Sequence, residues 1–331
     1  MNTFHPLRFK PTFREYIWGG RRLGERLNKP IGAGEHYAES WEIVDHGQDQ
    51  SIVAFGPYTD WPLRQFVLEH PRELFGQHPD FERFPLLFKF LDASRKLSVQ
   101  VHPDDEQGKQ LDPPDLGKTE AWVIIHADDD SELYAGLETG CDREALAEAV
   151  AQGNTEECLH SLKPQNGDCL FIPAGLVHAI GSGLLVAEIQ QSSDTTFRLF
   201  DWNRVGTDGK PRPLHIEQAL NTIDYGLGPA QPQIPEKTSH PDCSRLVACD
   251  KFVLDRWQSQ ATVQVGGDDR FHIIAVLEGS LIVTNDPAEQ PLSLGQTLLI
   301  PAASEACELQ PQTPSVWLDM YLPTAAELRG I

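Results

Sequence analysis

The chain has 331 residues and a formal net charge of −22, and its apolar residues, 40% of the total, are sufficient for more than one hydrophobic core. A field of this sign repels phosphate, which argues against nucleic acid and anionic membranes as partners but not against a small phosphorylated ligand bound by local lysines and arginines. No stretch approaches the ~20 apolar residues of a membrane span.

The cysteines and the N-terminal segment indicate the compartment. Six cysteines are scattered along the chain without a C-x-x-C pair, which in a large chain favours reduced thiols. The segment MNTFHPLRFKPTF lacks the apolar run of a signal peptide. We therefore expect a cytoplasmic protein.

The predicted elements are mostly strands, because 25 prolines and 26 glycines favour short strands joined by turns. Strands are predicted over 7–13, 39–45, 50–55, 84–93, 96–103, 120–127, 131–136, 167–180 and 183–191. Helices are predicted over 61–76 and 214–226, with two short helices in 141–162. Prolines gather in 226–241, which predicts a linker, and residues 242–331 are again rich in strand patterns.

Four residues in three separate segments predict a metal site. Gln100 and His102 are two apart in LSVQVHPDDE, so on a strand they project from the same face. Glu120 precedes the apolar run AWVII, and His178 follows a Pro-Ala-Gly turn. Two imidazoles, a carboxylate and an amide oxygen suit a single divalent ion, with zinc as the first choice.

A weak internal repeat predicts the architecture. Segment 167–178, GDCLFIPAGLVH, aligns with 295–306, GQTLLIPAASEA, and EAWVIIHA aligns with HIIAVLEG, which places His272 where Glu120 stands. The recurring Gly…Pro turn between strands indicates two related jelly-roll β-barrels. Ala306 occupies the position of His178 in the second copy, so we expect only the first barrel to hold metal.

Three long motifs carry a family resemblance. FPLLFKFLDASRKLSVQVHPDDE, GKTEAW and PAGLVHAIGSGLLVAEIQQSSDTTFRLFDWNR resemble type I mannose-6-phosphate isomerases in their short bacterial form. The resemblance spans roughly residues 5–225 and is faint over the last ninety. It implies a mainly β fold of two cupin-type jelly-roll barrels, with a few helices packed on the N-terminal part. We expect a catalytic domain over 1–228, a Pro-rich linker over 229–241 and a metal-free barrel over 242–331.

The resemblance also implies roles for particular residues. The family's metal ligands fall on His102, Glu120 and His178, with Gln100 as a further ligand in many members. Its catalytic arginine falls on Arg198, and Lys89 and Asp194 match residues assigned to catalysis or proton handling. Lys118, with Ser98, is assigned to substrate binding. The large helical insertion of the long form is missing here, which puts any substrate contact made by that insertion in doubt.

The chemistry of these residue types agrees with an aldose–ketose isomerase acting on mannose 6-phosphate and fructose 6-phosphate. A divalent ion with one carboxylate and neutral ligands keeps net positive charge and can polarise sugar oxygens while an enediolate forms. Arg198 suits the enediolate or a phosphate, and a lysine could act as a base if burial lowers its pKa. Two alternatives stay open: an iron-dependent cupin oxygenase, and a non-catalytic, metal-bearing sugar-phosphate-binding protein. The oligomeric state is not fixed by the sequence.

Overall fold

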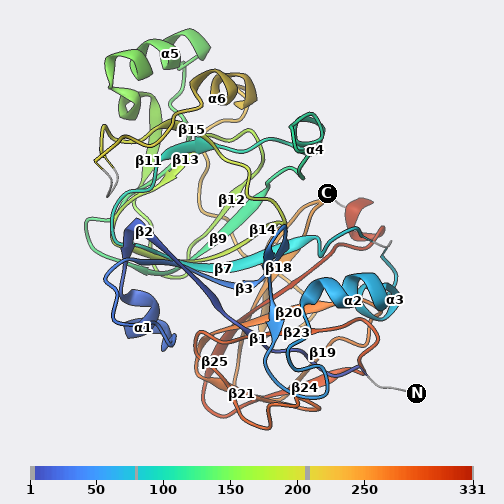
Figure 1. Cartoon of the computed structure of the whole chain (residues 1–331). Coiled ribbons are helices and arrows are strands. Elements are labelled where there is room, and N and C mark those ends of the chain that lie inside the picture. The colour runs from blue at the N-terminus through green and yellow to red at the C-terminus, as the bar shows by residue number, and fades with distance from the viewer. Residues whose placement is uncertain (1–3, 79–80, 206–208, 330–331) are drawn as a thin grey trace.

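The computed structural model describes residues 4–78, 81–205 and 209–329, and strands dominate these ranges, as expected. Figure 1 shows the strands of the N-terminal and C-terminal parts as two adjoining groups, with short helices at the periphery. None of the helices in the described ranges has the length and apolar character needed to cross a membrane.

The largest N-terminal sheet has six strands in the order β12-β9-β14-β7-β3-β2. Its strands are β2 (Thr12–Gly20), β3 (Tyr37–Ile43), β7 (Leu86–Ala93), β9 (Glu120–Ala127), β12 (Cys169–Ile172) and β14 (Leu184–Gln191). Every residue of β7 and β14 is buried, because both faces of these central strands are covered.

Side chains alternate between the two faces of this sheet, and the alternation separates the core from the site. Phe88 and Phe90 of β7 belong to a core that also contains Ile273 and Leu318 of the C-terminal part. Leu91, on the opposite face of β7, belongs to a second cluster inside the N-terminal part. One face of the sheet therefore packs against the C-terminal part, and the other faces the interior of the N-terminal part.

A five-stranded sheet in the order β11-β10-β13-β8-β15 forms the other side of the N-terminal part. Its strands are β8 (Val99–Val101), β10 (Leu133–Leu137), β11 (Leu159–Leu162), β13 (His178–Ile180) and β15 (Phe197–Phe200). Two small two-stranded sheets accompany it, formed by β1 (Phe9–Lys10) with β6 (Ile52–Val53) and by β4 (Asp45–His46) with β5 (Asp49–Gln50).

The helices are short and lie at the periphery of the molecule (Figure 1). They are α1 (Arg22–Leu27), α2 (Leu63–Glu69), α3 (Pro71–Phe75), α4 (Asp105–Gly108), α5 (Arg143–Gln152) and α6 (Ile216–Thr222), with 3-10 turns η1 (Thr155–Cys158) and η2 (Glu327–Arg329). Leu146 of α5 and Leu220 of α6 pack on the five-stranded sheet. The single helix predicted over 61–76 is wrong: Pro71 forces His70 out of helical geometry, with φ −137° and ψ 44°, and splits the segment into α2 and α3.

The predicted pair of helices in 141–162 is correct only in part. An α-helix and a 3-10 turn form, but the last four residues, LHSL, are β11 instead. These residues pair with β10, and Leu133 lies opposite Leu162. The sheet edge therefore overrides the helical pattern of the segment.

The C-terminal part repeats the strand order of the N-terminal part. Its six-stranded sheet runs β16-β17-β18-β25-β20-β23, and a four-stranded sheet runs β19-β24-β21-β22. The strands are β16 (Glu236–Lys237), β17 (Cys243–Ala248), β18 (Val253–Ser259), β19 (Val263–Val265), β20 (His272–Glu278), β21 (Ser280–Val283), β22 (Leu292–Ser293), β23 (Thr297–Ile300), β24 (Cys307–Pro311) and β25 (Ser315–Tyr321).

The register of the strands agrees with the repeat seen in the sequence. Glu120 of β9 lies opposite Ile172 of β12, and His272 of β20 lies opposite Ile300 of β23. The aligned strands β9 and β20 thus begin with different side chains: a carboxylate in the N-terminal copy and an imidazole in the C-terminal copy. The division at residues 228 and 242 stays a prediction.

Candidate active site

The three predicted ligands with acidic or imidazole side chains converge in the N-terminal part. His102 follows β8, Glu120 begins β9 and His178 begins β13. One ligand atom from each lies within 4.8 Å of the others, and all three residues are buried. The fold therefore brings together three side chains from segments that are separate in the sequence.

Backbone carbonyls orient both imidazoles. The Nδ1 of His102 lies 2.8 Å from the carbonyl oxygen of Thr195, and the Nδ1 of His178 lies 2.9 Å from that of Leu176. A carbonyl only accepts hydrogen bonds, so each Nδ1 carries the proton and each Nε2 keeps a free lone pair. The Nε2 atoms lie 3.3 Å and 3.9 Å from the two oxygens of Glu120.

The charges in this triad fit a divalent cation. Burial lowers the pKa of His178 to about 3, and burial together with Lys118 lowers the pKa of His102, so both rings are neutral and can donate a lone pair to a metal ion. Burial alone would raise the pKa of Glu120, but Lys118 and His102 hold it well below its usual range. Two neutral imidazoles oriented by carbonyls and one buried carboxylate form a donor set that could hold a divalent metal ion.

Gln100 lies beside the triad, between two other predicted site residues. On β8 it is opposite His178 on one neighbouring strand and opposite Arg198 on the other. Its Nε2 is 3.4 Å from the Nε2 of His178, and its Oε1 accepts a hydrogen bond of 3.2 Å from Ser98. An amide rotation would exchange the oxygen and the nitrogen, so ligation by Gln100 stays a prediction.

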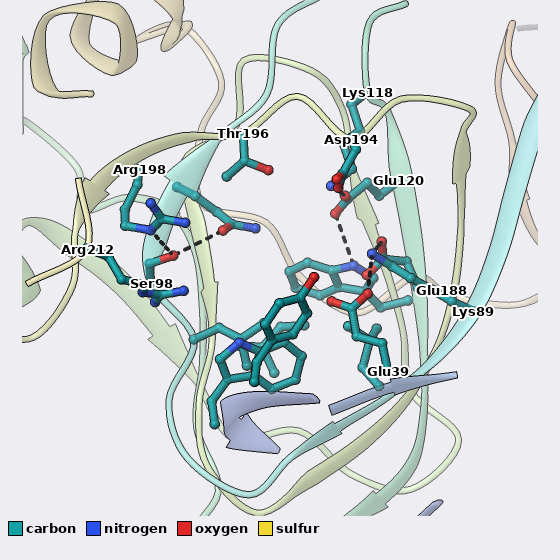
Figure 2. Close-up of a pocket in the computed structure, with 17 residues that line it drawn as sticks. Glu39, Lys89, Ser98, Lys118, Glu120, Glu188, Asp194, Thr196, Arg198 and Arg212 are labelled. Carbon is teal, nitrogen blue, oxygen red and sulfur yellow. Dashed lines mark hydrogen bonds and ion pairs between the residues drawn. The ribbon is translucent and has the colours of Figure 1, made fainter. Parts of the chain in front are cut away.

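The triad borders a cavity of about 300 Å³. Figure 2 shows Arg198, Arg212 and Ser98 on one side of the cavity and Lys89, Glu188 and Glu39 on the other. The lining consists of Tyr16, Trp18, Glu39, Lys89, Leu91, Leu97, Ser98, Gln100, Lys118, Glu120, Trp122, Ile180, Glu188, Asp194, Thr196, Arg198 and Arg212. Of the nine predicted site residues, all except His102 and His178 line it, and those two contact the lining residue Glu120.

Arg198 is a guanidinium that neutral groups hold in the cavity. Its Nε donates to Ser98 Oγ at 3.3 Å, and its Nη1 donates to the carbonyl of Pro213 at 2.9 Å. Within the described ranges no carboxylate forms an ion pair with Arg198, whereas the neighbouring Arg212 is paired with Asp201 at 2.6 Å. Arg198 therefore offers positive charge to an anionic ligand.

Lys89 lies between two carboxylates on the opposite wall. Its Nζ is 3.2 Å from Glu188 and 3.7 Å from Glu39. Burial would lower the pKa of Lys89, but these carboxylates outweigh it and raise the pKa, so the conditional interpretation of Lys89 as a neutral base is not supported. Burial and the charge of Glu120 raise the pKa of Glu188 to about 7.

Lys118 and Asp194 enter the site from loops. The Nζ of Lys118 is buried and lies 2.9 Å from Glu120 Oε1 and 3.4 Å from His102 Nε2. Asp194 is exposed at the cavity and belongs to the loop between β14 and β15. Both residues are therefore within the cavity lining, one beside the triad and one at a solvent-accessible edge.

Four further residues line the cavity that were not predicted from the sequence: Glu188, Glu39, Tyr16 and Arg212. Glu188 carried a usable signal, since it is an acidic residue in the middle of the otherwise apolar run LLVAEI. A charged group in a fully buried strand requires a partner, and the register supplies it, because Glu188 lies directly opposite Lys89.

Comparisons with known proteins point to one family. A family model described as phosphomannose isomerase type I, catalytic domain, matches residues 7–119. Mannose-6-phosphate isomerase ManA of Bacillus subtilis is 37% identical, with 90% of this chain and 94% of ManA covered. Mannose-6-phosphate isomerase of Streptococcus mutans is 34% identical, with 89% and 92% covered. The crystal structure of mannose 6-phosphate isomerase from Bacillus subtilis is similar with a TM-score of 0.88 and 31% identity, over 96% of this chain and 100% of that one.

Proposed function

The chain belongs to the type I phosphomannose isomerase family, and from that premise we propose that it interconverts mannose 6-phosphate and fructose 6-phosphate with one zinc ion per chain. The observation that carries the proposal is the arrangement of the cavity. A buried His102–Glu120–His178 triad adjoins it. On one wall lies Arg198, which forms no ion pair with a carboxylate of the described residues, and on the other wall lies a lysine–carboxylate pair.

His102, Glu120 and His178 would hold the zinc ion, with Gln100 as a further ligand. When bound, zinc supplies a Lewis acid that polarises the oxygens of the sugar. One carboxylate among neutral ligands leaves net positive charge at the site, whereas a cluster of carboxylates would have cancelled it. Zinc is favoured over magnesium or calcium because imidazole nitrogen provides two of the ligands.

Arg198 is proposed to stabilise negative charge during the reaction. Isomerisation removes the proton at C2, passes through an enediolate and returns a proton to C1. The Arg198 guanidinium is fixed by Ser98 and Pro213, so little reorganisation is needed when charge develops near it. Lys118 and Ser98 are proposed to bind the substrate, and Lys118 adds a second positive charge close to Glu120.

Glu188, with Lys89, is proposed to handle the proton between C2 and C1. A carboxyl with a pKa of about 7 can both accept and return a proton near neutral pH. Lys89 remains an ammonium 3.2 Å away and balances the charge when Glu188 is ionised. Asp194, exposed at the cavity, is proposed to assist opening of the sugar ring before the proton moves.

A cytoplasmic location is part of the proposal. All six cysteines are free in the structure, which suits a reducing compartment. The net charge of −22 disfavours nucleic acid and anionic membrane surfaces as partners and leaves a small sugar phosphate as the ligand.

The test is a coupled assay of purified enzyme with mannose 6-phosphate, followed by chelation and metal replacement. We expect turnover that disappears with the loss of zinc and returns when zinc is added, with one zinc ion bound per chain. Unphosphorylated mannose serves as the control substrate. It should react far more slowly, because it lacks the phosphate that the positively charged side chains of the cavity are expected to bind. Turnover that persists after complete removal of metal would contradict the role of zinc.

A further inference from the structure

A lysine of the C-terminal part reaches the loops of the site. Lys251 lies in the turn between β17 and β18, and its Nζ is 2.7 Å from Asp105 Oδ2, three residues beyond His102. We propose that Lys251 and Asp105 form a positioning pair through which the C-terminal sheet holds the loop that carries Lys118. The inference rests on the proposed function, because its consequence is argued for the isomerase reaction.

Asp105 binds both segments that flank the site. Its Oδ1 accepts hydrogen bonds of 2.9 Å from the backbone N–H of Gly117 and 2.9 Å from the side-chain amide of Gln191. Gln191 in turn accepts a bond of 3.1 Å from the N–H of Thr119 and donates its own N–H to the carbonyl of Thr119 at 3.2 Å. The backbone N–H groups of the two residues that flank Lys118 are thus held, that of Gly117 by Asp105 directly and that of Thr119 through Gln191.

The loop of Lys118 is also in close backbone contact with the segment after His102. A Cβ at Gly117 would lie 2.6 Å from the carbonyl carbon of Asp104 and 2.6 Å from the nitrogen of Asp105, so only glycine fits there. The N–H of Lys118 donates to the carbonyl of Pro103 at 2.9 Å. A movement of Asp105 is therefore transmitted to Lys118 by direct contacts.

Lys251 holds Oδ2 of the Asp105 carboxylate, while Gly117 and Gln191 hold its Oδ1. Both side chains are partly exposed, 26% for Lys251 and 31% for Asp105, so without the ammonium the carboxylate could turn toward water. Asp250 also contacts the Lys251 ammonium at 2.7 Å and helps to fix it. The contact to Lys118 matters for catalysis because the Lys118 Nζ lies 2.9 Å from the ligand Glu120.

The test compares Lys251→Ala and Lys251→Arg with the control Arg256→Ala. Arg256 is a matched control, since it is also a C-terminal cation that contacts the N-terminal part, but it donates to the carbonyl of Gly167, away from the loop of Lys118. We expect Lys251→Ala to reduce kcat/KM by about threefold to tenfold, Lys251→Arg to retain most of the activity and Arg256→Ala to match the wild type. Asp105→Asn should reduce kcat/KM by about 10–100-fold, the range for residues that orient an active site from behind.

Hydrogen exchange provides a readout that does not depend on activity. The backbone amides of Gly117 and Thr119 should exchange faster in zinc-loaded Lys251→Ala than in the wild type, and at wild-type rates in Arg256→Ala. The double variant Asp105→Asn/Lys251→Ala should be no worse than Asp105→Asn alone, because both changes break the same chain of contacts.

Unchanged kcat/KM and unchanged exchange in Lys251→Ala would overturn the inference, as would multiplicative effects in the double variant. Loss of activity without faster exchange at Gly117 and Thr119 would overturn it as well. If instead the wild type fails to isomerise mannose 6-phosphate, the proposed function is wrong, and the exchange comparison still decides whether Lys251 holds the loop.

Discussion

Arg198 is suited to stabilise negative charge in the reaction, because it is a cation without a paired carboxylate among the described residues. We expect Arg198→Ala to lower kcat by about 10²–10³-fold, the loss typical when a fixed donor to developing negative charge is removed. Steady-state kinetics and metal analysis check this, and the zinc content should not change. Arg143→Ala, which removes a surface arginine bonded to Asn221, is the control. Loss of zinc in Arg198→Ala would mean that the arginine is structural.

The environment of Glu188 leads to a second prediction, which concerns proton transfer. Glu188→Gln keeps the shape of the side chain but removes its ability to take up and return a proton. We expect kcat to fall by about 10²–10⁴-fold, the range for a general acid–base group, with a smaller change in KM. Stopped assays with mannose 6-phosphate measure both constants. A variant that keeps wild-type kcat would exclude Glu188 from proton transfer.

The sequence predicted the triad but not Glu188, and the reason is physical. His102, Glu120 and His178 lie at strand ends beside turn residues, so the local sequence alone indicates that these polar side chains are candidates for a site. Glu188 lies within a strand that is buried throughout, and its partner Lys89 comes from β7. Only the register between β14 and β7 places them opposite each other, and register is a non-local property.

At the scale of elements, the repeat keeps the strands and places an imidazole paired with carboxylates where the N-terminal copy has the predicted ligand Glu120. His272 takes the place of Glu120 at the start of β20, and its ring lies 2.8 Å from Asp319 and 3.1 Å from Asp268. The buried His272 ring thus lies between two carboxylates, with Nδ1 facing Asp319 and Nε2 facing Asp268, which favours the protonated form of the ring. The sequence predicted the substitution of the ligand but not its partners, because Asp319 comes from the neighbouring strand β25.

This arrangement predicts a pH-dependent stability. Burial would lower the pKa of His272, but Asp319 and Asp268 raise it from 6.5 to about 9. A raised pKa means that the protonated ring stabilises the fold fully below pH 6.5 and that this contribution is lost as the pH rises through about 9. We expect His272→Gln to lower the free energy of unfolding by about 3 kcal/mol at about pH 6, and by much less at about pH 10. Urea unfolding at both pH values checks this, and an equal loss at both would contradict it.

At the scale of the whole molecule, the two parts share a core instead of meeting at a linker. Phe271, which precedes β20, packs on Phe84 with ring centroids 4.8 Å apart and on Phe75 at 6.3 Å. The N-terminal segment also joins the second sheet, since Leu7 pairs with Leu299 and Arg8 forms a buried ion pair with Asp286. The Pro-rich stretch over 229–241 was visible in the sequence. The shared core was not, because an apolar residue gives no indication of which distant strand it will pack against.

A shared core predicts that both parts unfold together. Phe271 is fully buried, so Phe271→Ala should lower the free energy of unfolding by about 3–5 kcal/mol through lost contacts and a cavity. Leu68→Ala, at a side chain that is 67% exposed, is the control and should change little. Because Phe84 and Phe75 belong to the N-terminal part, the loss should appear in both halves at the same urea concentration. Isomerase activity reports on the N-terminal cavity, and hydrogen exchange of the backbone amides in β20 and β25 reports on the C-terminal sheet. If activity in Phe271→Ala persists at a urea concentration at which the β20 and β25 amides have lost their protection, the C-terminal sheet unfolds while the site stays intact. The site would then need neither the shared core nor Lys251.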